Sequence, residues 1–211
     1  MIEAIGDLIE ATTDILVATA ASPLVYLVVL LVAALDGFFP PVPSETIVVA
    51  VIAVGATTGA PVAAGIILAA AIGAILGDNL AYLLGRLVGT TRFRWMRRPS
   101  AMRILEWAAT GLRNRPASLI LIGRYIPIGR IAVNMMAGAT GLRHRRFLVL
   151  TIVAGFSWAA YAAVIGLFAA AWIRDSPLLA AVVAVVIAMV LGLVIDRIAS
   201  RISHRRSAAN V

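Results

Sequence analysis

Apolar residues fill most of this chain in long blocks, and prolines, glycines and charged residues interrupt them at only a few places. The blocks at 61–86, 147–172 and 177–196 run with little interruption. Each has at least the ~20 mainly apolar residues that a membrane-spanning helix needs. We predict that these three blocks span a membrane. Two further apolar blocks, at 22–59 and 116–141, are each broken in the middle by proline.

The first broken block predicts two short helices. Ser22 and Pro23 are favourable residues for a helix start, and the segment DGFFPPVPSET must end that helix. Ser44 can cap the second helix. Each half has about 14 residues and a length of about 21 Å, which is less than the ~30 Å hydrocarbon core. We therefore predict a re-entrant hairpin that enters and leaves by one face. One kinked spanning helix over 15–35 is the alternative, because hydropathy alone permits it.

The second broken block has the same pattern. It begins at Pro116 and is interrupted by Pro127 and Gly129. Arginines precede and follow it, so both of its ends are expected on one face. A spanning helix separates the two hairpins, which must then open to opposite faces. This is an inverted repeat, the plan of many secondary transporters, in which broken helices meet at a site near the bilayer midplane.

Composition agrees with a membrane protein. The 211 residues are 62% hydrophobic and only 13% charged, which is not typical of a soluble domain. The predicted fold is an all-α polytopic membrane protein forming one domain over 1–211, with two opposed re-entrant hairpins and three spanning helices. Amphipathic helices at the membrane surface are expected at 1–20, where acidic residues follow helical spacing, and at 100–114. The acidic start does not resemble a cleavable signal peptide.

Charge is distributed very unevenly along the chain. The acidic residues before position 86 have no basic counterpart, and all 18 basic residues are arginines from Arg86 onward. Their clusters lie between or after apolar blocks, so the positive-inside rule predicts that they are cytoplasmic. The basic tail at 197–211 is therefore expected in the cytoplasm. This explains the basic excess by topology, and no nucleic-acid partner is expected.

The missing residue types exclude several kinds of chemistry. The chain has no cysteine and no lysine, which rules out disulfides, thiolate metal sites and lysine Schiff bases. His144 and His204 both lie in arginine-rich surface segments. Lipid phosphatases need His and usually Lys with Arg, and phosphatidyl-alcohol transferases need an Asp-rich pattern that does not follow Asp36. We therefore expect no enzyme activity, no catalytic residue, no metal and no cofactor.

Charged residues nevertheless occur at both predicted hairpin tips. Asp36 and Glu45 flank the first break, and Arg124 and Arg130 flank the second. Charges at such depth need a partner, water or a function. We expect the carboxylates and guanidiniums to meet near the middle of the membrane and to leave donors for a phosphate. The local alternatives are helix-end roles for the acids and snorkelling of the arginines to headgroups.

The block at 61–86 carries a second polar stripe. Asp78, Tyr82 and Arg86 are spaced by four residues and so share one helix face. A proton relay and a helix-end anchor are both consistent with this stripe. In the same block, Gly73 and Gly77 offer a face for close helix packing.

Three motifs together resemble a known family. DGFFPPVPSE, GDNLAYLLGR and RYIPIGR followed by AG resemble the DedA family of bacterial membrane proteins, which is related to SNARE-associated Golgi proteins, to the VTT-domain superfamily and to eukaryotic lipid scramblases. The resemblance implies that Asp36 and Glu45 are the family's acidic pair and that Arg124 and Arg130 are its arginine pair. Many relatives carry Glu where this chain has Asp36.

The resemblance also implies a function. Gly77 and Asp78 would be the family's glycine–aspartate motif. The implied activity is that of a flippase or scramblase in the bacterial inner (plasma) membrane, moving undecaprenyl phosphate or another anionic phospholipid between leaflets with dependence on the proton-motive force. The arginine pair would bind the phosphate, and the acidic pair would take up and release protons. The alternatives are a proton-coupled ion antiporter and a non-transporting membrane-homeostasis scaffold. The expected partners are the bilayer, the lipid and protons, with a homodimer left open.

Overall fold

The computed structural model of the chain describes residues 14, 18–39, 44–89, 98–124, 127–172, 179, 181–183, 185–187 and 190. These residues form helices and connecting turns, without strands. The helices are α2 (Leu24–Asp36), α3 (Ser44–Thr58), α4 (Ala63–Val88), α5 (Pro99–Asn114), α6 (Pro116–Gly123), α7 (Pro127–Ala139) and α8 (His144–Trp172). The predicted segments 1–20, 177–196 and 197–211 lie wholly or largely outside the described residues.

The helix ends lie close to the predicted ones and have local causes. At the start of α2, the Ser22 hydroxyl accepts a hydrogen bond from the Leu24 backbone N–H at 3.3 Å. Helix α3 begins at Ser44, and α6 has Pro116 in its first turn. The alternative of a single helix over 15–35 falls partly outside the described residues. Within them, Ser22 and Pro23 form a turn that separates the helical residues 18–21 from α2.

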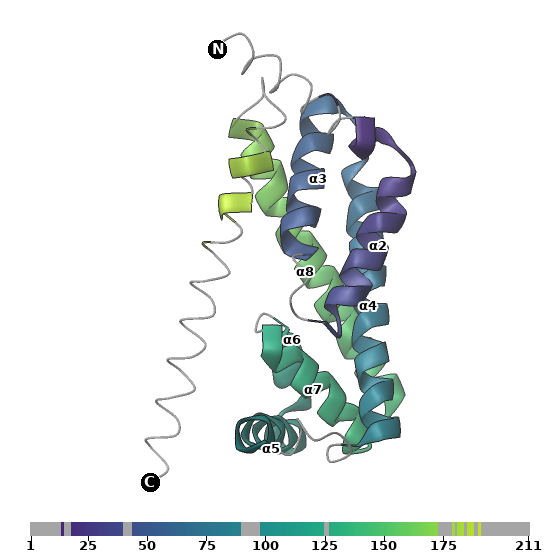
Figure 1. Ribbon diagram of the computed structural model, residues 1–211, viewed down its shortest axis with the longest axis vertical. Helices are drawn as coiled ribbons and strands as arrows, with labels where there is room; N and C mark the ends of the chain where they lie inside the picture. Colours follow the sequence, from purple (N-terminus) through teal and green to yellow (C-terminus); the bar gives the residue numbers. More distant parts are fainter. Residues whose placement is uncertain are drawn as a thin grey trace.

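Helices α4 and α8 are the long elements of the fold (Figure 1). They contain 26 and 29 residues, and they are the two helices in the described part of the chain that are long and apolar enough to cross a membrane. The pairs α2–α3 and α6–α7 are shorter. Helix α2 packs against α4 and α3 packs against α8, whereas α7 packs against α4 and α6 packs against α8. Each short pair is thus held between the same two long helices.

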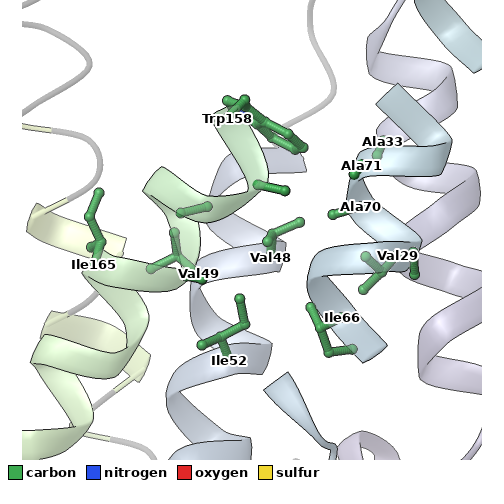
Figure 2. Packing of buried hydrophobic residues seen from close by; sticks show 14 of the residues in the cluster. Val29, Ala33, Val48, Val49, Ile52, Ile66, Ala70, Ala71, Trp158 and Ile165 are labelled. Atoms are coloured by element: carbon green, nitrogen blue, oxygen red, sulfur yellow. The ribbon is translucent and has the colours of Figure 1, made fainter. Parts of the chain in front are cut away.

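Most of the hydrophobic core of the described residues lies in two clusters that share α4 and α8. One cluster lies between α2, α3 and the long helices, and Figure 2 shows Val29, Val48, Ile52, Ile66 and Trp158 within it. The other cluster joins α5, α6 and α7 to the C-terminal part of α4 and the start of α8. Each short helix pair therefore packs against the long helices in its own cluster, and the two pairs meet between the two clusters.

The predicted glycine face of α4 brings α2 very close. A side chain at Gly73 would collide with the Leu30 carbonyl oxygen, and one at Gly77 would collide with the Ala34 carbonyl oxygen. Glycine permits this approach because it has no Cβ. The close contact places the C-terminal end of α2, with Asp36, beside the middle of α4.

Candidate functional site

The ends of the two short helix pairs face each other at mid-height of the molecule (Figure 1). The C-terminal end of α2 and the N-terminal end of α3 come from one side. The junction of α6 and α7 comes from the other. Helices α4 and α8 pass beside this meeting point. Four charged residues are buried there: Asp36, Asp78, Arg124 and Arg130.

The first ion pair joins α7 to α2. Arg130 Nη2 lies 2.6 Å from Asp36 Oδ1, and the same nitrogen donates to the Asp36 backbone carbonyl. The other carboxylate oxygen of Asp36 accepts a hydrogen bond from the Ser44 hydroxyl at the start of α3. Asp36 therefore links α2 to both α3 and α7. A contact between Asp36 and Arg130 is what the sequence predicted.

The second ion pair joins the α6–α7 junction to α4. Arg124 forms a salt bridge with Asp78, and both side chains are only 3% exposed. Asn134 of α7 donates from Nδ2 to the other Asp78 oxygen at 2.9 Å. The Arg124 guanidinium carbon lies 5.4 Å from the centre of the Trp158 ring, within the range of a cation–π contact. This pairing differs from the prediction, in which both arginines contacted the acids of the first hairpin, Asp36 and Glu45.

Glu45 lies at the edge of the same cluster. It is in the first turn of α3, where a carboxylate interacts favourably with the helix dipole. It interacts electrostatically with both Asp36 and Arg130, but it is only partly buried and is not a member of either ion pair. The structure thus brings all four predicted tip residues together and adds Asp78 from α4.

The two guanidiniums keep unused donors. The Nε atoms of Arg124 and Arg130 are buried and have no hydrogen-bond partner among the described residues. A buried donor without a partner costs roughly 1–3 kcal/mol. An anion that reached this position would relieve that penalty and would meet the fork geometry that suits phosphate oxygens.

The polar stripe of α4 does not act as one unit. Asp78 belongs to the charge cluster, whereas the buried Tyr82 donates its hydroxyl to the Leu142 carbonyl at 2.6 Å. Arg86 is exposed at the end of the helix. The Tyr82 side chain therefore anchors α4 to the turn before α8, and among the described residues no side-chain hydrogen bond links it to Asp78.

Sequence reasoning missed two members of the site. Asn134 was detectable in principle, because it is a polar residue one helical turn after Arg130 in an apolar segment. Trp158 gave no signal, because one aromatic residue in a long apolar helix is ordinary core material. Among the described residues, no group of three or more His, Cys, Asp and Glu side chains is arranged to hold a metal ion.

Comparison with known proteins places the chain among membrane proteins. An uncharacterized membrane protein of Mycobacterium tuberculosis is 29% identical over 132 residues, which cover 62% of this chain and 58% of that protein. One from Mycobacterium bovis is 28% identical over 173 residues, covering 76% and 78%. An alkaline phosphatase-like protein of Lactococcus lactis is 29% identical over 134 residues, covering 59% and 61%.

The chain thus matches a little over half the length of the Mycobacterium tuberculosis relative. No solved structure matches it. The family model described as the VTT domain matches residues 42–168. That match covers more than half of the sequence and includes the Glu45, Asp78, Arg124 and Arg130 positions. The chain therefore belongs to the VTT-domain family of membrane proteins, the family of the DedA proteins.

Proposed function

We propose that this protein is a proton-coupled lipid transporter that moves undecaprenyl phosphate, or another anionic phospholipid, between the leaflets of a bacterial inner membrane. The observation that carries the proposal is the pair of buried arginine–carboxylate contacts where the two short helix pairs meet. Buried charge inside a membrane protein is expensive and is usually functional.

Helix lengths support a re-entrant arrangement. Helices α2 and α3 have 13 and 15 residues, or about 20 and 22 Å, and so fall short of the ~30 Å hydrocarbon core. Their tip and that of α6–α7 would each reach the midplane from opposite faces. Large apolar side chains on the outer faces of α4 and α8 are exposed, among them Leu76, Leu83, Val153 and Val164, as lipid contact requires.

Competition between carboxylates and phosphate would provide the proton coupling. Asp36 and Asp78 occupy the guanidiniums in the present state. If one carboxylate accepts a proton, its arginine becomes available to a phosphate oxygen, because a neutral carboxyl group attracts the guanidinium less strongly. Release of the lipid would restore the ion pair and free the proton.

Glu45 gives the site an additional proton acceptor. With all five groups ionised, three carboxylates face two guanidiniums, so the cluster has one excess negative charge. A proton on Glu45 would bring the net charge of the whole cluster to zero. Arrival of an anionic headgroup adds negative charge and makes proton uptake more favourable. Lipid binding and proton uptake would then be linked by charge balance at one location.

The decisive experiment compares wild type with Glu45→Gln in proteoliposomes, with and without an imposed pH gradient. Undecaprenyl phosphate is tested against phosphatidylethanolamine. We expect Glu45→Gln to bind the lipid phosphate but to lose the response to the gradient. Glu106→Gln is the matched control, because Glu106 lies exposed on α5 outside the site. An unchanged gradient response in Glu45→Gln would show that Glu45 only starts a helix.

The same vesicles separate the competing functions. Cation exchange that survives Arg124→Gln while no lipid moves would favour an ion antiporter. No transport of either kind by well-folded wild-type protein would favour a scaffold. The proposed reaction breaks no bond, so inorganic phosphate is also measured. Release of phosphate by the protein would instead favour a hydrolase, as the name of the Lactococcus lactis relative suggests for that protein.

A further inference from the structure

A basic hollow lies away from the central site, lined by residues where α4 and α7 end and α8 begins. Figure 1 shows these helix ends at the bottom of the molecule. The volume of the hollow is about 600 Å³. Arg86 lines it from α4, Ala139 from α7, Arg143 from the turn before α8, and His144 and Arg145 from the first turn of α8. We call this region the basic hollow. It is separate from the two ion pairs of the central site.

Contacts between helices hold the basic hollow in shape. The Tyr82 hydroxyl bonds to the Leu142 carbonyl, and His144 Nε2 lies 2.8 Å from Asn79 Oδ1. The His144 and Tyr82 rings are 5.2 Å apart. Gly138 allows α7 to approach the Tyr82 carbonyl so closely that a Cβ would collide with it. The turn before α8 is therefore fixed to α4, and the arginines of both elements face one opening.

The charges in the basic hollow are not balanced by the described protein. The ion pairs among the described residues belong to the central site, so Arg86, Arg143 and Arg145 have no carboxylate partner there. Like charges gathered at one opening repel each other, and an anion between them would offset this. The start of α8 adds backbone N–H groups and the positive end of a helix dipole.

Membrane topology alone does not require this arrangement. Cytoplasmic arginines satisfy the positive-inside rule wherever they lie on the loops. Here arginines from two separate elements line one open hollow. Guanidiniums suit phosphate in particular, because each can donate two parallel hydrogen bonds to its oxygens.

We propose that the basic hollow is a binding site for a phosphate monoester group, presented by a membrane lipid or free in solution. The site is distinct from the transport site and does not depend on the transport proposal. Its ligand would bind at the protein surface without entering the central charge cluster.

The test uses a cysteine as a local reporter, because the natural chain has none. The full-length protein carries Ala139→Cys, and its rate of reaction with a maleimide is measured in neutral detergent. Inorganic phosphate, added at constant ionic strength with chloride, should slow the reaction. A ligand at twice its dissociation constant slows it about threefold, since the fraction of free protein equals 1/(1 + [L]/Kd). Thr140→Cys is the neighbouring control, because Thr140 does not line the hollow.

Arginine variants show whether the hollow itself recognises phosphate. Arg143→Gln with Arg145→Gln should abolish protection of the reporter thiol at position 139, whereas Arg146→Gln with Arg103→Gln should leave it unchanged. Both double variants remove two exposed positive charges, but only the first pair lines the hollow. Protection that persists without Arg143 and Arg145, or that equal chloride reproduces, would overturn the proposal.

Two soluble lipids identify the source of the phosphate. If dioctanoyl phosphatidic acid protects the reporter thiol at a lower concentration than inorganic phosphate does, the natural ligand is a lipid headgroup. If the two compounds protect the thiol at the same concentration, the natural ligand is a free phosphate compound. Equal protection by dioctanoyl phosphatidylcholine would refute phosphate-monoester recognition. Because the reporter is at position 139, these results do not change if the central site proves not to transport lipid.

Discussion

Replacing Asp78 by Asn tests whether the central charge cluster is held together by its ion pairs. The substitution keeps the size of the side chain and leaves an amide oxygen that can still accept the Asn134 hydrogen bond. It removes the carboxylate from Arg124. Arg124 would then be a buried guanidinium without its counter-charge, on a side chain that is only 3% exposed.

The size of the effect follows from burial. Both partners are almost inaccessible to water, so solvent screening is small. Removal of one partner from such a pair costs about 3–5 kcal/mol. The Trp158 ring still stabilises the cation by about 0.5–2 kcal/mol. We therefore expect the free energy of unfolding to fall by about 3 kcal/mol, the lower end of the range.

Unfolding in mixed micelles with increasing dodecyl sulfate, followed by circular dichroism, measures this loss. Asp78→Asn combined with Arg124→Gln should be more stable than Asp78→Asn alone, because the second change removes the unpaired charge. Glu106→Gln is the control and should change stability by less than about 0.5 kcal/mol, as is usual for exposed positions. If Asp78→Asn is as stable as this control, or if the double variant is no more stable than the single one, the ion pair does not hold the cluster together.

Three further predictions concern packing, recognition and topology. Gly138→Ala should lower the free energy of unfolding by about 1–3 kcal/mol, because the new Cβ would collide with the Tyr82 carbonyl. Gly123→Ala is the control in the same unfolding assay and should be tolerated, because its Cβ would lie 3.4 Å from Val133. Arg130→Lys should slow lipid movement in proteoliposomes, because an ammonium cannot donate two parallel hydrogen bonds to phosphate, and a wild-type rate would show that positive charge alone is sufficient. The thiol introduced by Phe39→Cys should react with an impermeant maleimide added outside cells, and labelling only from the cytoplasm would contradict opposed hairpins.

The limits of the helices could be predicted from the sequence because they are set locally. Residues such as Pro116 and Ser44 favour a helix start, and no helix can cross the proline-rich segment after Asp36. The length and apolar composition of the blocks also indicated the two long helices, now α4 and α8. The charged residues of both tips were visible for a similar reason, because few ionisable groups interrupt the apolar blocks.

The partners of the buried charges, in contrast, became known only from the packing of the helices. Sequence could not assign Asp78 to Arg124, because the pair is 46 residues apart and its distance depends on how α6 and α7 pack against α4. The contributions of Asn134 and Trp158 arise in the same way, from helices that are brought together by packing. Secondary structure follows from neighbours along the chain, but a buried charge is satisfied by whichever group the packed helices place beside it.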